Sequence, residues 1–198
     1  MNKILNVFIA ILIFLYPFLI FFGLNYLSPR FIALIIGFLF VLRFLLLKNT
    51  HSSKAFPRWF LIGLILIGLV ISILGLSFNS HLFLMLYPVL INLLFLIVFL
   101  YSLIYPPTII ERFATLTHKK AFPKEALNYM KKITITWIIF FSLNGLIALY
   151  TVFFTSVKIW SLYNGFISYI LIGLLFLIEL LIRKKVQRKL AQRDLKHG

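Results

Sequence analysis

An all-α bundle of about six membrane-spanning helices is the fold that this sequence predicts, and three observations lead to it. Hydrophobic residues make up 63% of the 198-residue chain and charged residues only 12%, whereas a soluble domain is nearer half apolar and a quarter charged. The apolar residues gather in six long segments, and most basic residues lie between or after them. These observations exclude a soluble enzyme, which could not bury so much apolar surface, and a disordered chain, which needs low hydrophobicity.

Each of the six segments is long enough to cross the hydrocarbon core of a bilayer as a helix, which takes about 17–25 apolar residues. Strands of a membrane barrel would alternate apolar and polar residues instead. Together the segments form one transmembrane domain over residues 1–182, followed by a basic cytoplasmic tail over residues 183–198. The predicted spans cover residues 4–24, 31–47, 59–76, 82–104, 133–155 and 160–182.

The distribution of lysine and arginine predicts that both termini are cytoplasmic. The chain carries a net charge of +16, from 20 basic residues against 4 acidic ones. With six spans, all but three of the 20 basic residues fall on the side that holds both termini, and the exceptions are Arg30, Arg43 and Lys158. Basic residues concentrate in cytoplasmic loops, so the charge is explained by topology and nucleic acid is not expected as a partner.

Aromatic residues near the predicted span ends are typical of anchors at the lipid–water interface, where amphipathic rings are favoured. We interpret most of them in this way. They are Trp59, Tyr87, Tyr105, Trp137, Trp160 and Tyr163.

The cytoplasmic loop over residues 105–132 predicts a short helix that lies on the inner leaflet, between spans four and five. Thr108, three residues before Glu111, matches a capping box at the start of a helix. The apolar face of this helix consists of Ile109, Ile110, Phe113 and Leu116, the pattern of an interfacial helix. We interpret Glu111 first as part of the cap. With Arg112 it is also the candidate catalytic or anion-binding pair.

Two ionisable residues lie within the predicted spans, where charged side chains are costly and are functional candidates by default. Arg43 and Glu179 each lie about 6–8 Å from the cytoplasmic boundary. Both are candidates for binding a ligand or lipid, and they could pair across the bundle. The simpler interpretation is that Arg43 extends its charge to the boundary and that Glu179 pairs with Arg183 one helical turn away.

Three asparagines are the other candidate ligand- or lipid-binding residues. Asn92 and Asn144 each lie about 15–17 Å from the outer ends of their spans, so each is the natural hydrogen-bond partner of the other. Gly145 follows Asn144 and lets a neighbouring helix approach closely. Asn164 lies near the outer end of the last span, where it can reach headgroups or water. We favour a structural role between helices, with a substrate cavity as the alternative.

Polar, aromatic and glycine residues in the second half of the chain form a pattern over about residues 82–183. The pattern comprises Tyr87, Pro88, Asn92, Pro107, Glu111, Arg112, Ala114, Tyr129, Trp137, Phe140, Phe141, Asn144, Gly145, Tyr163, Asn164, Gly165, Tyr169, Gly173 and Glu179. It resembles an uncharacterised family of bacterial inner-membrane proteins, often encoded beside ketosynthases, acyl carrier proteins and acyltransferases of aryl-polyene-type fatty-acid clusters. The resemblance implies a multi-pass protein of the bacterial inner membrane, but no reaction. The "ketosynthase" label of some members does not fit, because that chemistry needs a nucleophilic Cys and this chain has none.

The leading hypothesis is an accessory, non-enzymatic membrane protein that binds or passes a lipidic, acyl-type product. Its basic cytoplasmic surfaces would meet anionic membrane lipids or an acidic partner such as an acyl carrier protein. Two alternatives stay open: a membrane enzyme acting on a lipid or acyl donor at the inner leaflet, and a subunit of a small-solute transporter. We expect no cofactor and no metal site, because the chain has no Cys and its four His residues are scattered over loops.

Overall fold

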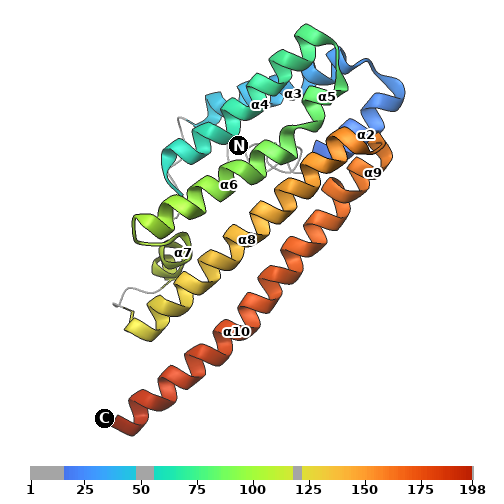
Figure 1. Ribbon diagram of the computed structural model, residues 1–198. Helices are drawn as coiled ribbons and strands as arrows, with labels where there is room; N and C mark the ends of the chain where they lie inside the picture. The colour runs from blue at the N-terminus through green and yellow to red at the C-terminus, as the bar shows by residue number, and fades with distance from the viewer. Residues whose placement is uncertain (1–15, 48–55, 118–121, 198) are drawn as a thin grey trace.

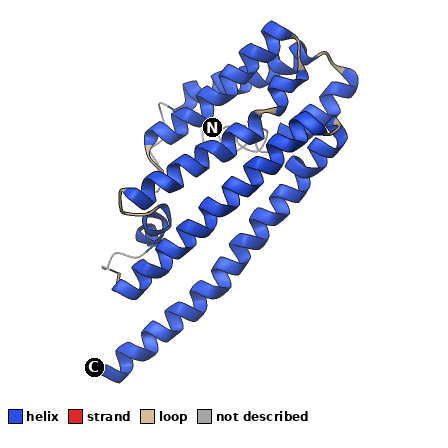
Figure 2. Cartoon of the chain, viewed as in Figure 1, coloured by secondary structure: helices blue, strands red, loops and turns tan. Residues whose placement is uncertain are grey.

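The computed structural model describes residues 16–47, 56–117 and 122–197, and this part of the chain is helical without strands (Figure 2). Its elements are α2 (Tyr16–Tyr26), α3 (Pro29–Leu47), α4 (Arg58–Phe78), α5 (His81–Met85), α6 (Tyr87–Ile104), α7 (Ile109–Thr117), α8 (Lys124–Phe154), α9 (Val157–Leu162), the π-helical turn η1 (Tyr163–Ile167) and α10 (Ser168–His197). The predicted all-α class is confirmed.

Five helical stretches in the described part are long and apolar enough to cross a membrane, which indicates a membrane-embedded protein. They are Pro29–Leu46, Arg58–Phe78, His81–Ile104, Lys124–Phe154 and Val157–Arg183, and each overlaps a predicted span. The first predicted span, residues 4–24, is described only from Tyr16 onward, as α2. The remainder of that span lies outside the described residues.

The long helices pack as a row of neighbours (Figure 1). In this row α3 contacts α4, α4 contacts α6 and α6 contacts α8. α10 contacts α8 and then runs away from it toward the C-terminus (Figure 1). At one end of the bundle, α2 contacts α3 and α5 as well as α9 and η1. It therefore links the first helices of the row to the last.

α8 turns a stripe of buried residues, spaced three and four apart, toward the interior, as one face of a helix requires. The stripe consists of Ala126, Met130, Thr134, Trp137, Phe141, Asn144, Ala148 and Thr151. Its aromatic members pack against rings of α6: the ring centroid of Phe141 lies 5.0 Å from that of Phe95 and 5.3 Å from that of Phe99. The opposite face of α8 carries exposed apolar side chains, which suit contact with lipid.

α3 and α4 approach each other closely because small residues line their contact. A Cβ atom on Gly37 would lie 3.2 Å from the Cβ atom of Ser72. At Gly68, the ring of Phe40 occupies the space that a Cβ atom would need. Small residues of this kind allow membrane helices to pack backbone to backbone, so this contact depends on the absence of side chains.

The loop between α6 and α8 contains the predicted short helix, α7. The Thr108 hydroxyl accepts a hydrogen bond from the backbone N–H of Glu111 at 3.2 Å, which confirms Thr108 as the cap of this helix. Ile109 is 1% exposed and packs into the aromatic core between α4, α6 and α8, whereas Phe113 is exposed. The first turn of α7 is thus anchored in the bundle, and only its later turns present apolar side chains outward.

The last predicted span is interrupted by a π turn. α9 passes into η1 before α10 begins, and a π turn takes more residues than an α turn. Trp160, Asn164 and Ser168 are accordingly buried at intervals of four. α10 then continues to His197, so the tail predicted after residue 182 prolongs the same helix (Figure 1).

Candidate functional site

Asn92 of α6 and Asn144 of α8 meet in the interior, as predicted. The Nδ2 atom of Asn144 donates a hydrogen bond to Oδ1 of Asn92 at 3.0 Å, and Nδ2 of Asn92 donates to the carbonyl oxygen of Pro88 at 2.8 Å. Both residues are buried. Gly145 permits the approach, because a Cβ atom there would lie 3.2 Å from the Cβ atom of Asn92.

The π turn η1 adds two more side chains to this polar contact. The Tyr163 hydroxyl donates to Oδ1 of Asn144 at 2.9 Å. The Nδ2 atom of Asn164 donates to Oγ1 of Thr151 at 3.1 Å and to the carbonyl oxygen of Trp160 at 2.9 Å. Asn164 is buried, and its amide hydrogens are used within the bundle and not toward headgroups or water.

The resulting network joins α6, α8 and η1 and is satisfied by its own members. Every fully enclosed side-chain nitrogen or oxygen in the described part of the chain has a hydrogen-bond partner. A buried network whose side chains bond to one another in this way holds helices together. The geometry therefore favours the structural interpretation of Asn92, Asn144 and Asn164 over a substrate cavity.

Glu179 lies on the face of α10 that turns toward the bundle. Ile172 and Leu175, seven and four residues before it, pack against the aromatic core, and Glu179 itself is 6% exposed. The Nε atom of Arg183 lies 3.8 Å from Oε1 of Glu179, so the predicted pair on one helix is confirmed. From α8, the Tyr129 hydroxyl donates to the backbone carbonyl oxygen of Glu179 at 3.2 Å.

Three candidates remain. Arg43 is half-buried on α3. At the start of α7, the backbone N–H of Glu111 binds Thr108, and Nε of Arg112 donates to the carbonyl oxygen of Pro107 at 3.1 Å. These contacts place both residues in the α6–α7 turn, and a catalytic or anion-binding role of their side chains stays a prediction.

Within the described ranges, no three His, Cys, Asp or Glu side chains lie together as a metal ion would need. No protein-family model matches the chain, and neither the curated proteins nor the solved structures contain a match. The class of protein is therefore defined by the fold and the site alone. It is a helical, membrane-embedded bundle with a satisfied polar network and, apart from it, a buried carboxylate on its last helix.

We expect the Asn92–Asn144 hydrogen bond to appear as a coupling energy in a double-mutant cycle. Asn92→Leu and Asn144→Leu should each lower the stability of the protein in detergent. The double variant should lose about 0.6–1.7 kcal/mol less stability than the sum of the two single losses. This difference is the coupling energy typical of polar contacts between membrane helices. Unfolding in SDS measures the three variants.

The matched control for this cycle is Thr136→Val. The Thr136 side chain is exposed, and its hydroxyl donates to the carbonyl oxygen of Lys132 on its own helix. It should show no coupling to Asn92→Leu. Additive effects of the two asparagine variants would contradict the assignment of the network as a link between helices.

Proposed function

We propose that this chain is an accessory protein of the bacterial inner membrane that binds an amphiphilic, acyl-type lipid at the inner leaflet. The observation that carries the proposal is the buried Glu179 with Arg183 beside it, on a helix that is otherwise apolar as far as Arg183. An ionisable residue within a membrane-spanning segment is a functional candidate by default. A polar pair at the end of an apolar helix matches an amphiphile, whose polar head would meet the pair while its chains follow the helix.

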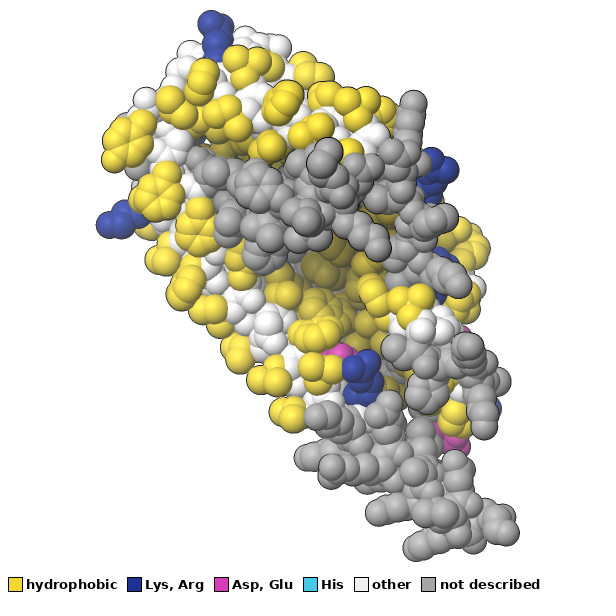
Figure 3. All heavy atoms as spheres, turned by 180° about the vertical axis from the view of Figure 1, so that it is seen from behind, with side chains coloured by type: hydrophobic (Ala, Val, Ile, Leu, Met, Phe, Trp, Pro, Cys, Tyr) yellow, Lys and Arg dark blue, Asp and Glu magenta, His cyan; other side chains and the backbone are white. Residues whose placement is uncertain are grey.

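The surface of α10 supports this assignment. Apart from Glu179, most side chains of α10 before Arg183 are apolar, and several are about half exposed, such as Leu174, Leu177 and Leu181. On the rear face of the molecule, Figure 3 shows a hollow lined by hydrophobic side chains, with an acidic and a basic side chain next to each other at its lower margin. Apolar surface beside a charged pair is the complement of a lipid.

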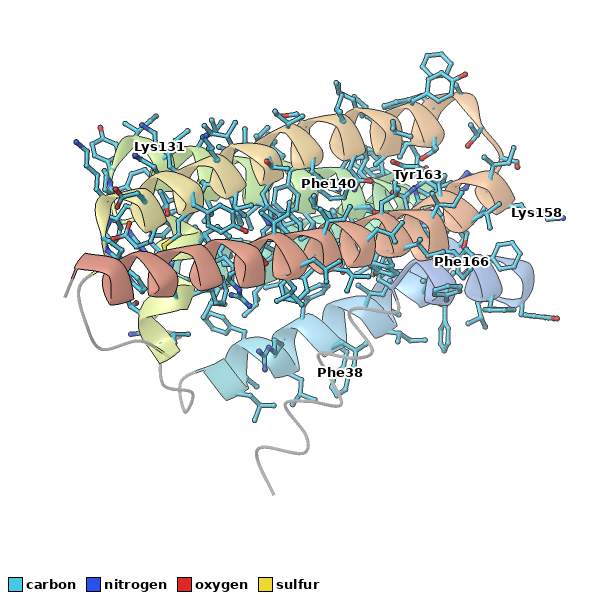
Figure 4. All side chains as sticks on the ribbon, turned by 90° about the horizontal axis from the view of Figure 1, so that it is seen from below. Phe38, Lys131, Phe140, Lys158, Tyr163 and Phe166 are labelled. Carbon is cyan, nitrogen blue, oxygen red and sulfur yellow. The ribbon has the colours of Figure 1, made fainter. Side chains whose placement is uncertain are left out.

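The proposal includes six spans with both termini in the cytoplasm, and the basic side chains support it. Lys131 and Lys158 lie at opposite ends of the bundle (Figure 4). The end at which α8 begins and the last span finishes holds most of the described basic residues: Arg58, Arg112, Lys124, Lys131, Lys132 and Arg183. The opposite end holds Arg30 and Lys158. By the positive-inside rule, the first of these ends is cytoplasmic.

Two further features fit this orientation. The later turns of α7, with Phe113 and Leu116 exposed, would lie on the inner leaflet. The helical segment after Arg183 would extend about 20 Å into the cytoplasm and, with its basic residues, would meet anionic lipid or an acidic carrier protein. A reaction at Glu111 and the transport of a small solute stay predictions, without a feature in the described part of the chain that favours them.

Native mass spectrometry of the gently purified protein tests the proposed function. The wild type should retain lipid-sized adducts through detergent removal. The double variant Glu179→Gln, Arg183→Gln should lose most of them, because the polar pair that holds the head is gone. The control is Lys124→Gln, Glu125→Gln, which removes one charge of each sign from exposed positions at the start of α8.

Thermal unfolding of each variant separates loss of binding from loss of fold. The proposal requires that the double variant at α10 unfold near the temperature of the control and still carry fewer adducts. Equal retention by wild type, double variant and control would refute it, as would a wild type that carries no lipid.

A further inference from the structure

The carboxylate of Glu179 is buried without a hydrogen-bond donor from the described residues. The Nε atom of Arg183 lies 3.8 Å from its Oε1 atom, beyond the roughly 2.7–3.2 Å of an N–H···O hydrogen bond. The hydrogen bond from Tyr129 goes to the backbone carbonyl of Glu179 and not to its carboxylate. A buried carboxylate is normally both paired and hydrogen-bonded, so this one has capacity for a donor.

The carboxylate also remains within reach. Every fully enclosed side-chain nitrogen or oxygen of the described residues has a hydrogen-bond partner. The Glu179 carboxylate has no hydrogen-bond partner among these residues, so its oxygens are not fully enclosed. The residue as a whole is nevertheless only 6% exposed. A small donor group approaching from outside the bundle can therefore contact it.

Arg183 offers the complementary half of the site. Its side chain is 46% exposed, and its Nε atom forms the ion pair with Glu179. The two terminal amino groups of a guanidinium carry four of its five N–H donors, and they suit the oxygens of a phosphate. Because the Nε atom of Arg183 lies 3.8 Å from Oε1 of Glu179, an anion at Arg183 and a cationic donor at Glu179 would bind next to each other.

We propose that the lipid bound at this site is zwitterionic and has a primary ammonium head, as in a phosphoethanolamine lipid. This inference rests on the proposed function and names its ligand class. The phosphate would meet Arg183 and the ammonium would donate to Glu179, because a two-carbon linker keeps those groups close enough to meet two adjacent side chains. A purely anionic head would be repelled by Glu179, and a trimethylated ammonium has no N–H to donate. The acyl chains would lie on exposed apolar side chains beside the pair, such as Ile178 and Ile182.

A competition between headgroups on the wild-type protein tests this inference. The protein is incubated in mixed micelles with equal amounts of phosphatidylethanolamine, phosphatidylglycerol and phosphatidylcholine of identical acyl chains, and retained lipids are counted by native mass spectrometry. We expect about fivefold enrichment of phosphatidylethanolamine over each of the others, the ratio that one ion pair supports. Glu179→Gln should reduce this ratio to about one, whereas Glu125→Gln, at an exposed glutamate, should leave it unchanged.

The outcomes separate this inference from the proposed function. If the wild type retains lipid but shows no preference for phosphatidylethanolamine, or if Glu179→Gln keeps the full preference, the headgroup assignment is wrong and the lipid site stands. If the wild type retains no lipid of any kind, the proposed function itself fails. The competition on the wild type does not depend on how well the variants fold.

Discussion

Gly68→Ala should lower the stability of the bundle by about 2 kcal/mol or more, although it adds a single methyl group. The added Cβ atom would overlap the ring of Phe40, which is 2% exposed and cannot move into open space. Overpacking a filled interior costs about 1–3 kcal/mol, and here the overlap lies in the contact between α3 and α4. Thermal unfolding in detergent, or the concentration of SDS that unfolds the protein, measures the loss.

Two variants make this prediction specific. Gly173→Ala, on α10, adds the same methyl group where nothing lies within 4 Å, so it should leave stability unchanged or raise it by up to about 1 kcal/mol through helix propensity. Phe40→Leu removes the ring atoms that the new Cβ atom would meet. In that background Gly68→Ala should be far less damaging. An equal loss in both backgrounds would show that ring overlap is not the cause.

Trp160→Ala should destabilise the protein by about 3 kcal/mol, near the lower end of the range for removing a buried indole. Trp160 is 0% exposed, and its Nε1–H donates to the carbonyl oxygen of Met85 at 3.1 Å. The substitution leaves a cavity where α9 meets α2 and α5, and it also leaves that carbonyl without its indole donor. In a membrane, packing and hydrogen bonds are the interactions that hold helices together. The lost packing and the lost hydrogen bond should therefore both lower stability.

The comparison for this prediction is Trp59→Ala. Trp59 is 42% exposed at the start of α4, and its ring makes an edge contact with Tyr101. Its removal should lower the unfolding temperature much less than Trp160→Ala does. Similar effects of the two substitutions would contradict the burial of Trp160 as the source of its contribution.

Pairs of residues at matching depth could be predicted from the sequence, but contacts across turns could not. Asn92 and Asn144 were identifiable as partners because a polar amide in an apolar span needs another at the same depth. Tyr163 and Trp160 were interpreted as interface anchors from their positions near a span end. The structure places Trp160, like Tyr87 and Trp137, in the core and Tyr163 on Asn144. Tyr163 belongs to the π turn η1, and the hydrophobic pattern does not reveal a π turn.

The candidate site likewise includes one contact that the sequence predicts and others that it does not. The pairing of Glu179 with Arg183 follows from their spacing on one helix, and the structure confirms it. Tyr129 is fifty positions away in the chain, so only the packing of α8 against α10 reveals its contact with Glu179. The close approach at Gly68 was also missed, since a glycine in an apolar run gives no sign of which ring will cover it.

The central claim is that a membrane surrounds this bundle with the Glu179 end in the cytoplasm, and single-cysteine labelling tests it most directly. The chain has no Cys, so Lys158→Cys and Lys131→Cys, both exposed and at opposite ends of the bundle (Figure 4), each introduce one reactive thiol. With a membrane-impermeant maleimide on intact cells whose outer membrane has been made permeable, the proposed topology requires that Lys158→Cys react. Lys131→Cys should react only after the inner membrane is opened. The reverse pattern, or equal labelling of both positions in intact cells, would contradict the orientation on which the lipid site depends.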